Sequence, residues 1–257
     1  MIDLHCHLLP GVDDGAADLE EALSICRLAA KDGTTDLVAT PHLRHPRYWN
    51  DDAHGLEATF LALREAVDHE ELGVELHLGG EIAVSDASVE ELLQPGSRLF
   101  TMAGGKWVLL EFDFQGYGPD PVETVWEVAV KGFRPIVAHP ERLKWMAADF
   151  GLMSALARHG ATFQLTAMSL TGEFGRIARD AAHLLAEQGF VHFVSSDAHD
   201  PRLRRPGLAA AREVVTRSWG EAVARQLFLD HPRAVIQDRP LSGPAPIAPG
   251  KPGPGID

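Results

Sequence analysis

Short apolar runs recur along the chain, and each is followed by a segment with helical spacing or by a loop. They predict seven strands, over Ile2–His5, Asp36–Thr40, Val74–Gly79, Trp107–Phe112, Arg134–Ala138, Thr162–Thr166 and His192–Ser195. Strands that alternate with helices form βα units and a parallel sheet. Continuous apolar runs are typical of strands covered on both faces. A closed barrel and a doubly wound sheet both fit, because periodicity does not distinguish them.

Three helical segments share one design, with a helix-starting residue at one end and a glycine at the other. Residues 18–33 begin with Asp18 as an N-cap and carry acids in the first turn. Residues 119–132 place Pro121 near the first helical position, and residues 175–189 end on glycine in the same way. Further helices are predicted at 54–71, 149–159, 207–217 and 219–229.

The C-terminal end differs in composition from the rest of the chain. The segment "DRPLSGPAPIAPGKPGPGID" is rich in proline and glycine and has few large apolar residues. Such a segment buries too little apolar surface to offset its conformational entropy. We therefore expect one domain over residues 1–237 and a disordered tail over residues 238–257.

Composition narrows the choice of partners and compartment. Lys and Arg number 23 and Asp and Glu 37, so the net charge is 23 − 37 = −14. Nucleic acids and anionic membranes bind basic surfaces, so neither is expected as a partner of this acidic chain. Two cysteines imply no disulfide framework, and no stretch has the features of a signal peptide or a transmembrane helix. The expectation is a cytoplasmic protein without membrane insertion.

Residues that can bind metals follow six of the seven predicted strands. In a parallel α/β architecture the C-terminal strand ends share one face, where active sites lie. Imidazoles and carboxylates are the ligands of Zn, Mn and Fe(II). The set is too large for one tetrahedral ion, so we expect two or three metals that activate water for phosphoryl transfer. Its members are His5, His7, Asp14, His42, Glu81, Glu111, His139, Asp197 and His199.

Each of these residues alone has an ordinary structural explanation. His42 could cap a helix, Glu111 could pair with an arginine, and His139 could fix a turn before Pro140. The metal hypothesis rests on their coincidence at one face. The remaining histidines lack this context and are interpreted as surface or structural residues: His45, His54, His69, His77, His159, His183, His192 and His231.

The sequence lacks the motifs of cysteine-based phosphatases and of two other common classes of enzyme. A cysteine-based tyrosine phosphatase needs an arginine six residues after its cysteine, but Cys6 is followed there by Val12 and Cys26 by Asp32. There is no G-x-S-x-G elbow and no phosphate-binding P-loop. We interpret Cys6 as a small buried residue.

The motifs "DLHCHLLPGVDDG", "ATPHL", "GGEI", "LLEF", "AHPER" and "SSDAH" occur in the order typical of the polymerase and histidinol phosphatase superfamily. The chain most resembles its capsular-polysaccharide type of manganese-dependent protein-tyrosine phosphatase, from Met1 to about Pro206. The resemblance implies a distorted seven-stranded β/α barrel with three metal ions at its C-terminal mouth. Manganese is expected, with iron or zinc as alternatives.

The resemblance also implies a role for each residue. One ion would be held by His5, His7, Glu81 and Asp197, a second by Glu81, Glu111 and His139, and a third by Asp14, His42 and His199. A bridging hydroxide would attack phosphorus, with Asp14 in the catalytic machinery. Arg142 would bind the phosphate, although a salt bridge with Glu141 or another acid of the barrel is an alternative. Arg204 is the expected second phosphate ligand, with Arg202 and Arg205 as alternatives.

Several neighbouring residues have more than one possible role. Asp13 is expected to support a ligand or form a turn. Gln164, Thr166 and Ser169 could line the pocket or satisfy backbone groups. Residues 44–50 could form a loop at its rim that contacts substrate, or a surface loop with a packed aromatic residue.

Three functions compete. The resemblance implies a phosphotyrosine phosphatase acting on the tyrosine-rich tail of a bacterial tyrosine kinase that controls exopolysaccharide synthesis. A small-molecule phosphatase, for histidinol phosphate or a nucleotide, would use the same metal chemistry. A catalytically silent regulatory protein would be expected to lack ligands, and none is missing. Nuclease action is disfavoured by the acidic charge.

Overall fold

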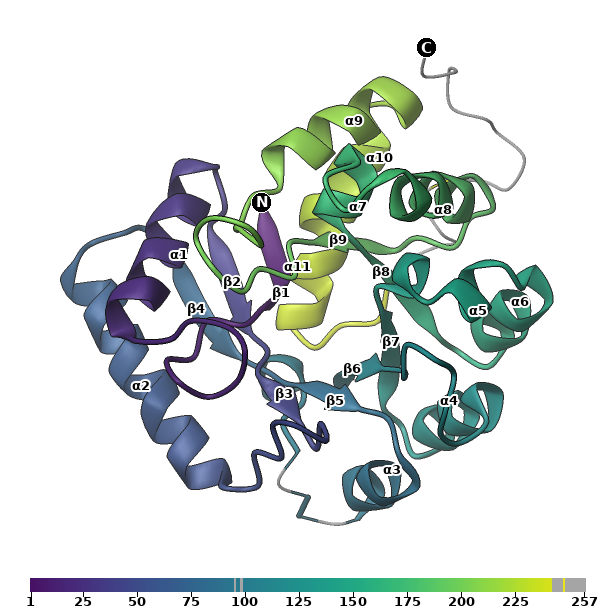
Figure 1. Cartoon of the computed structure of the whole chain (residues 1–257), viewed down its shortest axis with the longest axis horizontal. Coiled ribbons are helices and arrows are strands. Elements are labelled where there is room, and N and C mark those ends of the chain that lie inside the picture. Colours follow the sequence, from purple (N-terminus) through teal and green to yellow (C-terminus); the bar gives the residue numbers. More distant parts are fainter. Residues whose placement is uncertain (95, 98, 242–246, 248–257) are drawn as a thin grey trace.

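The computed structural model describes residues 1–94, 96–97, 99–241 and 247. Its strands are short and lie in the middle of the molecule, with helices around them (Figure 1). The strands within the described residues are β1 (Ile2–Cys6), β2 (Asp36–Ala39), β3 (His42–Leu43), β4 (Glu75–Leu78), β5 (Glu81–Ala83), β6 (Trp107–Glu111), β7 (Arg134–Ala138), β8 (Thr162–Thr166) and β9 (Phe193–Ser195).

The strands pair in parallel, as the alternation of strands and helices predicts. One sheet has the order β1-β2-β4, and the other has the order β3-β5-β6-β7-β8-β9. The end of β1 is bonded to the segment after β9, where Asp197 donates its N–H to the His5 carbonyl and His7 donates its own to the Ala198 carbonyl. The parallel α/β architecture is confirmed, whereas a single closed seven-stranded barrel is not.

Two predicted strands are each followed, after a short break, by a further strand that belongs to the other sheet. Thr40 and Pro41 separate β2 from β3, and Gly79 and Gly80 separate β4 from β5. The chains approach closely here, because a Cβ on Gly80 would lie 2.3 Å from a Leu43 side-chain carbon. Sequence analysis did not predict β3 or β5, since strands of two or three residues have no readable period.

The predicted helices are present, and Asp18 is the N-cap of the first one, as expected. Asp18 accepts a hydrogen bond from the Glu21 N–H, and Asp120 accepts from Val122 and Glu123. The short helices α3, α5, α7 and α11 were not predicted. The helices are α1 (Leu19–Lys31), α2 (Ala53–His69), α3 (Asp86–Leu93), α4 (Pro121–Val130), α5 (Lys144–Ala147), α6 (Phe150–Arg158), α7 (Ala167–Thr171), α8 (Arg176–Glu187), α9 (Ala209–Trp219), α10 (Glu221–Arg225) and α11 (His231–Ile236).

Two apolar clusters hold the strands in place. The larger one packs the strands against the outer helices. The smaller one lies among the strands and includes Leu4, Leu109, Ile136 and Phe193, and it also contains Val235 of α11. Because both faces of the strands are buried, the strands are rigid supports for the side chains at their ends.

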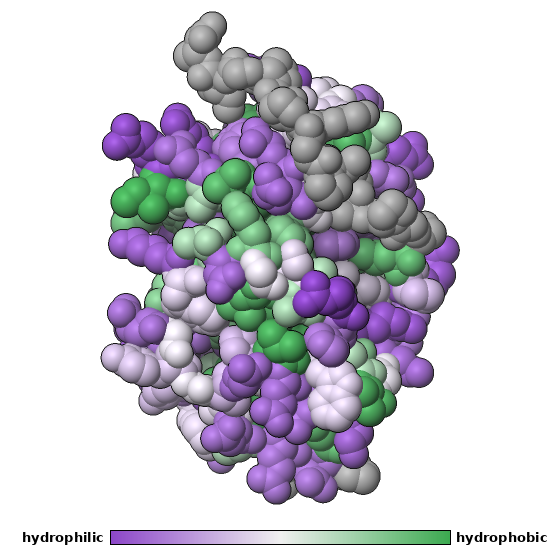
Figure 2. All heavy atoms as spheres, turned by 90° about the vertical axis from the view of Figure 1, so that its right-hand side faces the viewer, coloured by the Kyte–Doolittle hydropathy of each residue, from purple (hydrophilic) through white to green (hydrophobic). Residues whose placement is uncertain are grey.

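The outer surface mixes polar and apolar side chains. On the side of α4, α6 and α8, Figure 2 shows hydrophobic residues among hydrophilic ones, and Trp126, Val130 and Ile177 are exposed there. In the part of the chain that the structure describes, no helix has the length and apolar character needed to cross a membrane.

The chain continues to contact the body of the protein after α11. The Asp238 carboxylate accepts from the Lys106 N–H, and the Arg239 carbonyl accepts from Trp107 Nε1. Most of the predicted disordered tail, residues 242–246 and 248–257, lies outside the described residues.

Candidate metal centre

β1 delivers two histidines to one point at the C-terminal ends of the strands. His5 Nδ1 donates to Gln164 Oε1 over 2.9 Å, and His7 Nδ1 donates to Asp13 Oδ2 over 2.8 Å. Since these oxygens only accept, each Nδ1 carries a proton, so Nε2 is the atom that each neutral ring can offer as a ligand. The two Nε2 atoms lie 3.1 Å apart. Two lone pairs at this distance repel each other unless a cation or an extra proton lies between them.

Glu81, at the start of β5, is the central carboxylate of the site. Its Oε1 lies 3.3 Å from His5 Nε2 and 3.0 Å from His139 Nε2. Its Oε2 lies 3.3 Å from His7 Nε2 and 3.0 Å from His42 Nδ1. Burial by itself would raise the pKa of Glu81, but the surrounding histidines lower it well below its usual range. Glu81 is therefore a buried carboxylate ion, in a position to bridge two cations.

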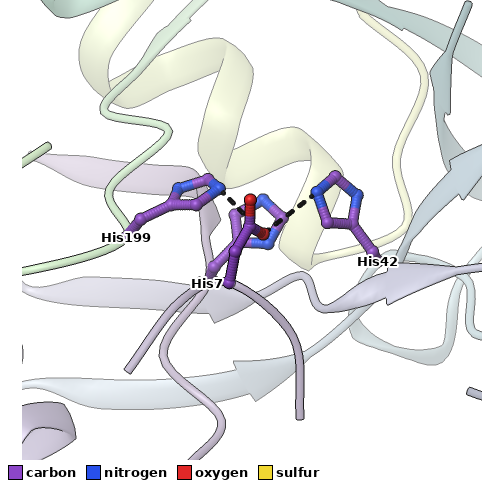
Figure 3. Close-up of side chains that lie close together, drawn as sticks. His7, His42 and His199 are labelled. Carbon is purple, nitrogen blue, oxygen red and sulfur yellow. Dashed lines mark ion pairs between the residues drawn. The ribbon is translucent and has the colours of Figure 1, made fainter. Parts of the chain in front are cut away.

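A second part of the site is built around Asp14 (Figure 3). His199 Nδ1 donates to the Asp197 carbonyl over 3.0 Å, so its Nε2 keeps a lone pair. That Nε2 lies 3.5 Å from Asp14 Oδ1, and His42 Nε2 lies 3.4 Å from the same oxygen. Burial and the neighbouring His7 lower the pKa of His199 to about 4, so its ring is neutral. The ligand atoms of His7, Asp14, His42 and His199 lie within 4.8 Å of one another.

β6 and β7 close the remaining side of the centre. His139 Nε2 lies 3.7 Å from Glu111 Oε1, and its Nδ1 is buried with no hydrogen-bond partner among the described residues. The backbone of His139 is left-handed, with φ 33°, which turns the chain sharply into Pro140. Burial, together with the nearby Glu81, raises the pKa of Glu111. His42, Glu81 and Glu111 form a further group whose ligand atoms lie within 4.8 Å of one another.

The electrostatics of the site favour an added positive charge. Burial lowers the pKa of His7, but Asp13 and Glu81 outweigh it and raise the pKa to about 9. Burial likewise opposes charge on His42, yet Glu81 and Asp14 raise its pKa to about 11. Carboxylates that attract protons this strongly also attract divalent cations, which compete for the same lone pairs. Nitrogen and carboxylate donors fit Mn, Fe or Zn.

Asp197 connects the centre to two arginines. Its Oδ1 lies 3.5 Å from His5 Nε2, and its Oδ2 accepts from Arg142 Nη1 and Arg204 Nη2, each over 2.6 Å. Arg205 instead pairs with Glu173, and Arg202 is exposed. Of the three arginines considered from sequence as the second phosphate ligand, only Arg204 therefore lines the site. Arg142 pairs with Asp197, which agrees with the alternative of a salt bridge to an acid other than Glu141.

The mouth of the centre is a hollow of about 150 Å³. It is small beside ligand pockets of roughly 300–1,000 Å³, so it admits a group such as a phosphate rather than a whole peptide side chain. Its lining consists of Asp14, His42, His45, Arg47, Glu81, Glu111, Phe114, His139, Arg142, Asp197, His199 and Arg204.

The structure brings all nine expected ligands to one site but groups some of them differently. His7 also belongs to the Asp14 group, and His42 also belongs to the group of Glu81 and Glu111. Asp13 supports His7 as expected, and Gln164 supports His5. Thr166 and Ser169 are bound to the buried Glu141 carboxylate instead of lining the hollow.

Of the three remaining lining residues, sequence reasoning placed His45 and Arg47 only within a possible rim loop, and it missed Phe114. His45 was interpreted as a surface or structural residue, but its ring stacks on His42 with centroids 4.7 Å apart. Arg47 belongs to the loop that was suggested as a rim, and Phe114 lies just beyond the "LLEF" motif. Arg47 follows His42 and Phe114 follows Glu111 within a few residues. This closeness to expected ligands is the sequence signal that could have identified them.

A fold of parallel strands whose C-terminal ends carry clustered histidines and carboxylates defines a metallohydrolase-like protein. The comparisons then specify its family. The family model described as "Capsular polysaccharide synthesis, CpsB/CapC" matches residues 1–237. The chain belongs to this family.

Named relatives agree with that assignment. The chain is 31% identical over 234 residues to tyrosine-protein phosphatase YwqE of Bacillus subtilis, covering 88% of each chain. It is 27% identical over 243 residues to tyrosine-protein phosphatase CpsB of Streptococcus agalactiae, covering 93% of this chain and 99% of the relative.

A solved structure matches the whole fold. The crystal structures of YwqE from Bacillus subtilis and CpsB from Streptococcus pneumoniae are described as unique metal-dependent tyrosine phosphatases, and the matching chain superimposes with a TM-score of 0.89 at 27% identity. The match covers 98% of this chain and all of the other. A TatD-like protein from Archaeoglobus fulgidus, at 13% identity and a TM-score of 0.56, shows likeness of fold alone.

Proposed function

We propose that this protein is a metal-dependent protein-tyrosine phosphatase that hydrolyses phosphotyrosine. Its substrate is the phosphorylated tail of a bacterial tyrosine kinase that controls capsule or exopolysaccharide synthesis, and it works in the cytoplasm. The observation that carries the proposal is the buried convergence of the His5 and His7 Nε2 atoms on Glu81, beside two arginines.

Nine residues would hold three divalent ions, manganese first, with iron or zinc as alternatives. We assign His5, His7, Glu81 and Asp197 to one ion, Glu81, Glu111 and His139 to a second, and Asp14, His42 and His199 to the third. When bound, such ions supply an activated water and neutralise the oxygens of a phosphoryl group. Gln164 and Asp13 hold His5 and His7 in the tautomer that offers Nε2 as a ligand.

The remaining polar groups would act on the substrate. Arg142 and Arg204 reach the same carboxylate oxygen of Asp197 and are 22% and 28% exposed, so their free N–H groups can donate to phosphate oxygens. The imidazoles of His199 and His42, which lie against its carboxylate, hold the pKa of Asp14 far below its usual range. Asp14 is therefore ionised, and it acts in catalysis as a charged ligand and not as a proton donor.

We further propose that residues 1–237 form one catalytic barrel. If β2 with β3 and β4 with β5 are each taken as one interrupted strand, the nine strands occupy seven positions. The bridge between Cys6 and Ala198 then joins β1 to the chain that follows β9. This arrangement is a distorted seven-stranded barrel with the metal centre at its C-terminal mouth.

The test is phosphate release from a phosphotyrosine peptide and, in parallel, from histidinol phosphate, using chelated protein reloaded with Mn, Fe or Zn. We expect metal-dependent turnover of the peptide that is lost in His42→Ala and Arg142→Ala. His159→Ala and Arg202→Ala are matched controls, since both residues are exposed. Turnover of histidinol phosphate alone would replace this function with that of a small-molecule phosphatase, and no turnover would favour a regulatory role.

A further inference from the structure

The proposed function uses nine of the twelve residues that line the hollow, seven as metal ligands and two as phosphate-binding arginines. The other three are His45, Arg47 and Phe114. Because the hollow holds little more than the phosphate, the group esterified to that phosphate must lie at the rim. These three residues are therefore the ones that meet the substrate outside its phosphoryl group.

The rim has two sides, which belong to different loops. His45 and Arg47 lie in the loop after β3, and Phe114 lies in the loop after β6. In the sheet, β5 runs between β3 and β6. The two loops consequently flank Glu81. With the phosphate in the hollow, the organic part of the ester would extend outward between these two loops.

Both sides of the rim are aromatic. The His45 and Tyr48 rings stack on His42, with centroids 4.7 and 5.9 Å from it and interplanar angles of 26° and 4°. Phe114 stacks on His139 at 5.7 Å and 24°, and the Arg142 guanidinium lies 5.3 Å from its centroid. The Phe114 side chain is nevertheless 42% exposed, which leaves ring surface available for a further aromatic group.

We infer that Phe114, together with His45 on the opposite side of the rim, selects aryl phosphates by packing against the aromatic ring of the substrate. This inference rests on the proposed function and deepens it, because it assigns the choice of a tyrosine ester to named residues. Aromatic side chains gain from offset or edge-to-face contacts with a ring. An alkyl ester such as phosphoserine offers no such surface.

The experiment compares wild type with Phe114→Leu and Phe114→Tyr in the metal-loaded, full-length protein. Substrates are a phosphotyrosine peptide, its phosphoserine counterpart and phenyl phosphate, and competitive inhibition by inorganic phosphate is measured for each variant. Trp126→Leu removes an exposed aromatic residue of α4 that does not line the hollow and is the matched control. Metal content is measured throughout, because Phe114 touches His139.

We expect Phe114→Leu to lose roughly 3- to 10-fold in kcat/KM for both aryl substrates. Inhibition by inorganic phosphate and metal content should stay within twofold, since neither requires the ring, and Phe114→Tyr should retain wild-type activity. An equal loss for phosphoserine, or no loss for aryl esters, would overturn the inference while the phosphatase function stands. Wild-type protein that hydrolyses alkyl esters but not phosphotyrosine would overturn both.

Discussion

The metal centre and a second group, formed by Asp36, Glu75 and His77 on β2 and β4, contain the same types of side chain in different surroundings. In the second group, His77 Nε2 donates to Asp36 Oδ1 over 3.1 Å, and the Thr35 hydroxyl donates to Asp36 Oδ2 over 2.7 Å. Both partners of the ion pair are partly exposed, at 17% and 15%.

In the metal centre the corresponding groups are buried and gather around one carboxylate. Glu81 is 1% exposed, and the Nε2 atoms of His5 and His7 point at each other and at its carboxylate. We therefore expect metal at the buried centre and not at the second group, although both contain ligand-type residues. What distinguishes the centre is the burial of several lone pairs that hydrogen bonds within the described chain leave unmatched.

The largest effect should come from the bridging carboxylate. Glu81→Gln keeps the size of the side chain but removes its charge, so we expect phosphatase activity to fall roughly 100- to 1,000-fold or more. Glu75→Gln in the second group should leave activity unchanged. Steady-state kinetics at saturating metal measure both, and a similar loss in the two variants would contradict the distinction drawn here.

Metal binding should stabilise the folded protein through the metal centre and not through the group of Asp36, Glu75 and His77. A ligand at 100 times its Kd stabilises the folded state by about 2.7 kcal/mol, which corresponds to a rise in Tm of about 5–10 °C for a chain of this size. Thermal unfolding of chelated protein, with and without Mn, should show this rise in wild type and in Asp36→Asn. A His199→Ala variant that kept the full rise would argue against the assigned ligand set.

A smaller effect should follow from the groups that orient the ligands. Gln164→Met keeps the volume of the side chain but removes the acceptor for His5 Nδ1–H. Loss of such a supporting hydrogen bond weakens metal affinity roughly 10- to 100-fold. Metal titration monitored by activity measures the change. Equal affinity in wild type and variant would show that the tautomer of His5 does not depend on Gln164.

The smallest effect should come from His192, which lies outside the metal centre and affects how stability depends on pH. His192 Nδ1 accepts a hydrogen bond from the Phe163 N–H over 3.2 Å, which requires a neutral ring. Burial, with His231 nearby, lowers the pKa of His192 to about 4. Because the unfolded chain takes up this proton near pH 6.5 and the folded chain does not, stability is complete above pH 6.5 and falls on acidification toward pH 4.

When the pH falls from 7 to 5.5, the contribution of His192 should lower the free energy of unfolding by about 1 kcal/mol. His192→Asn offers an amide oxygen near the position of Nδ1 and has no proton to gain. Urea unfolding at the two pH values should therefore show a smaller pH-dependent loss in the variant than in wild type. An identical loss would assign the acid sensitivity to other groups.

Local features of the chain were predictable because they depend on near neighbours in sequence. Asp18 and Asp120 cap helices through hydrogen bonds to residues two or three positions away. The alternation of apolar runs with helices predicted parallel pairing, and parallel pairing predicted that His5, His42 and Glu81 would meet at one face. The same reasoning did not find β3 and β5, which exist only because neighbouring strands pair with them.

The sequence by itself thus determined which residues are chemically able to bind metal and at which end of the strands they gather. Only the tertiary structure decided how they meet: that Arg204 and not Arg205 reaches Asp197, that His7 faces both Glu81 and the Asp14 group, and that His45 and Phe114 form the rim. The reason is physical. Strand periodicity sets which side a residue points to, whereas distances between loops depend on how distant segments pack.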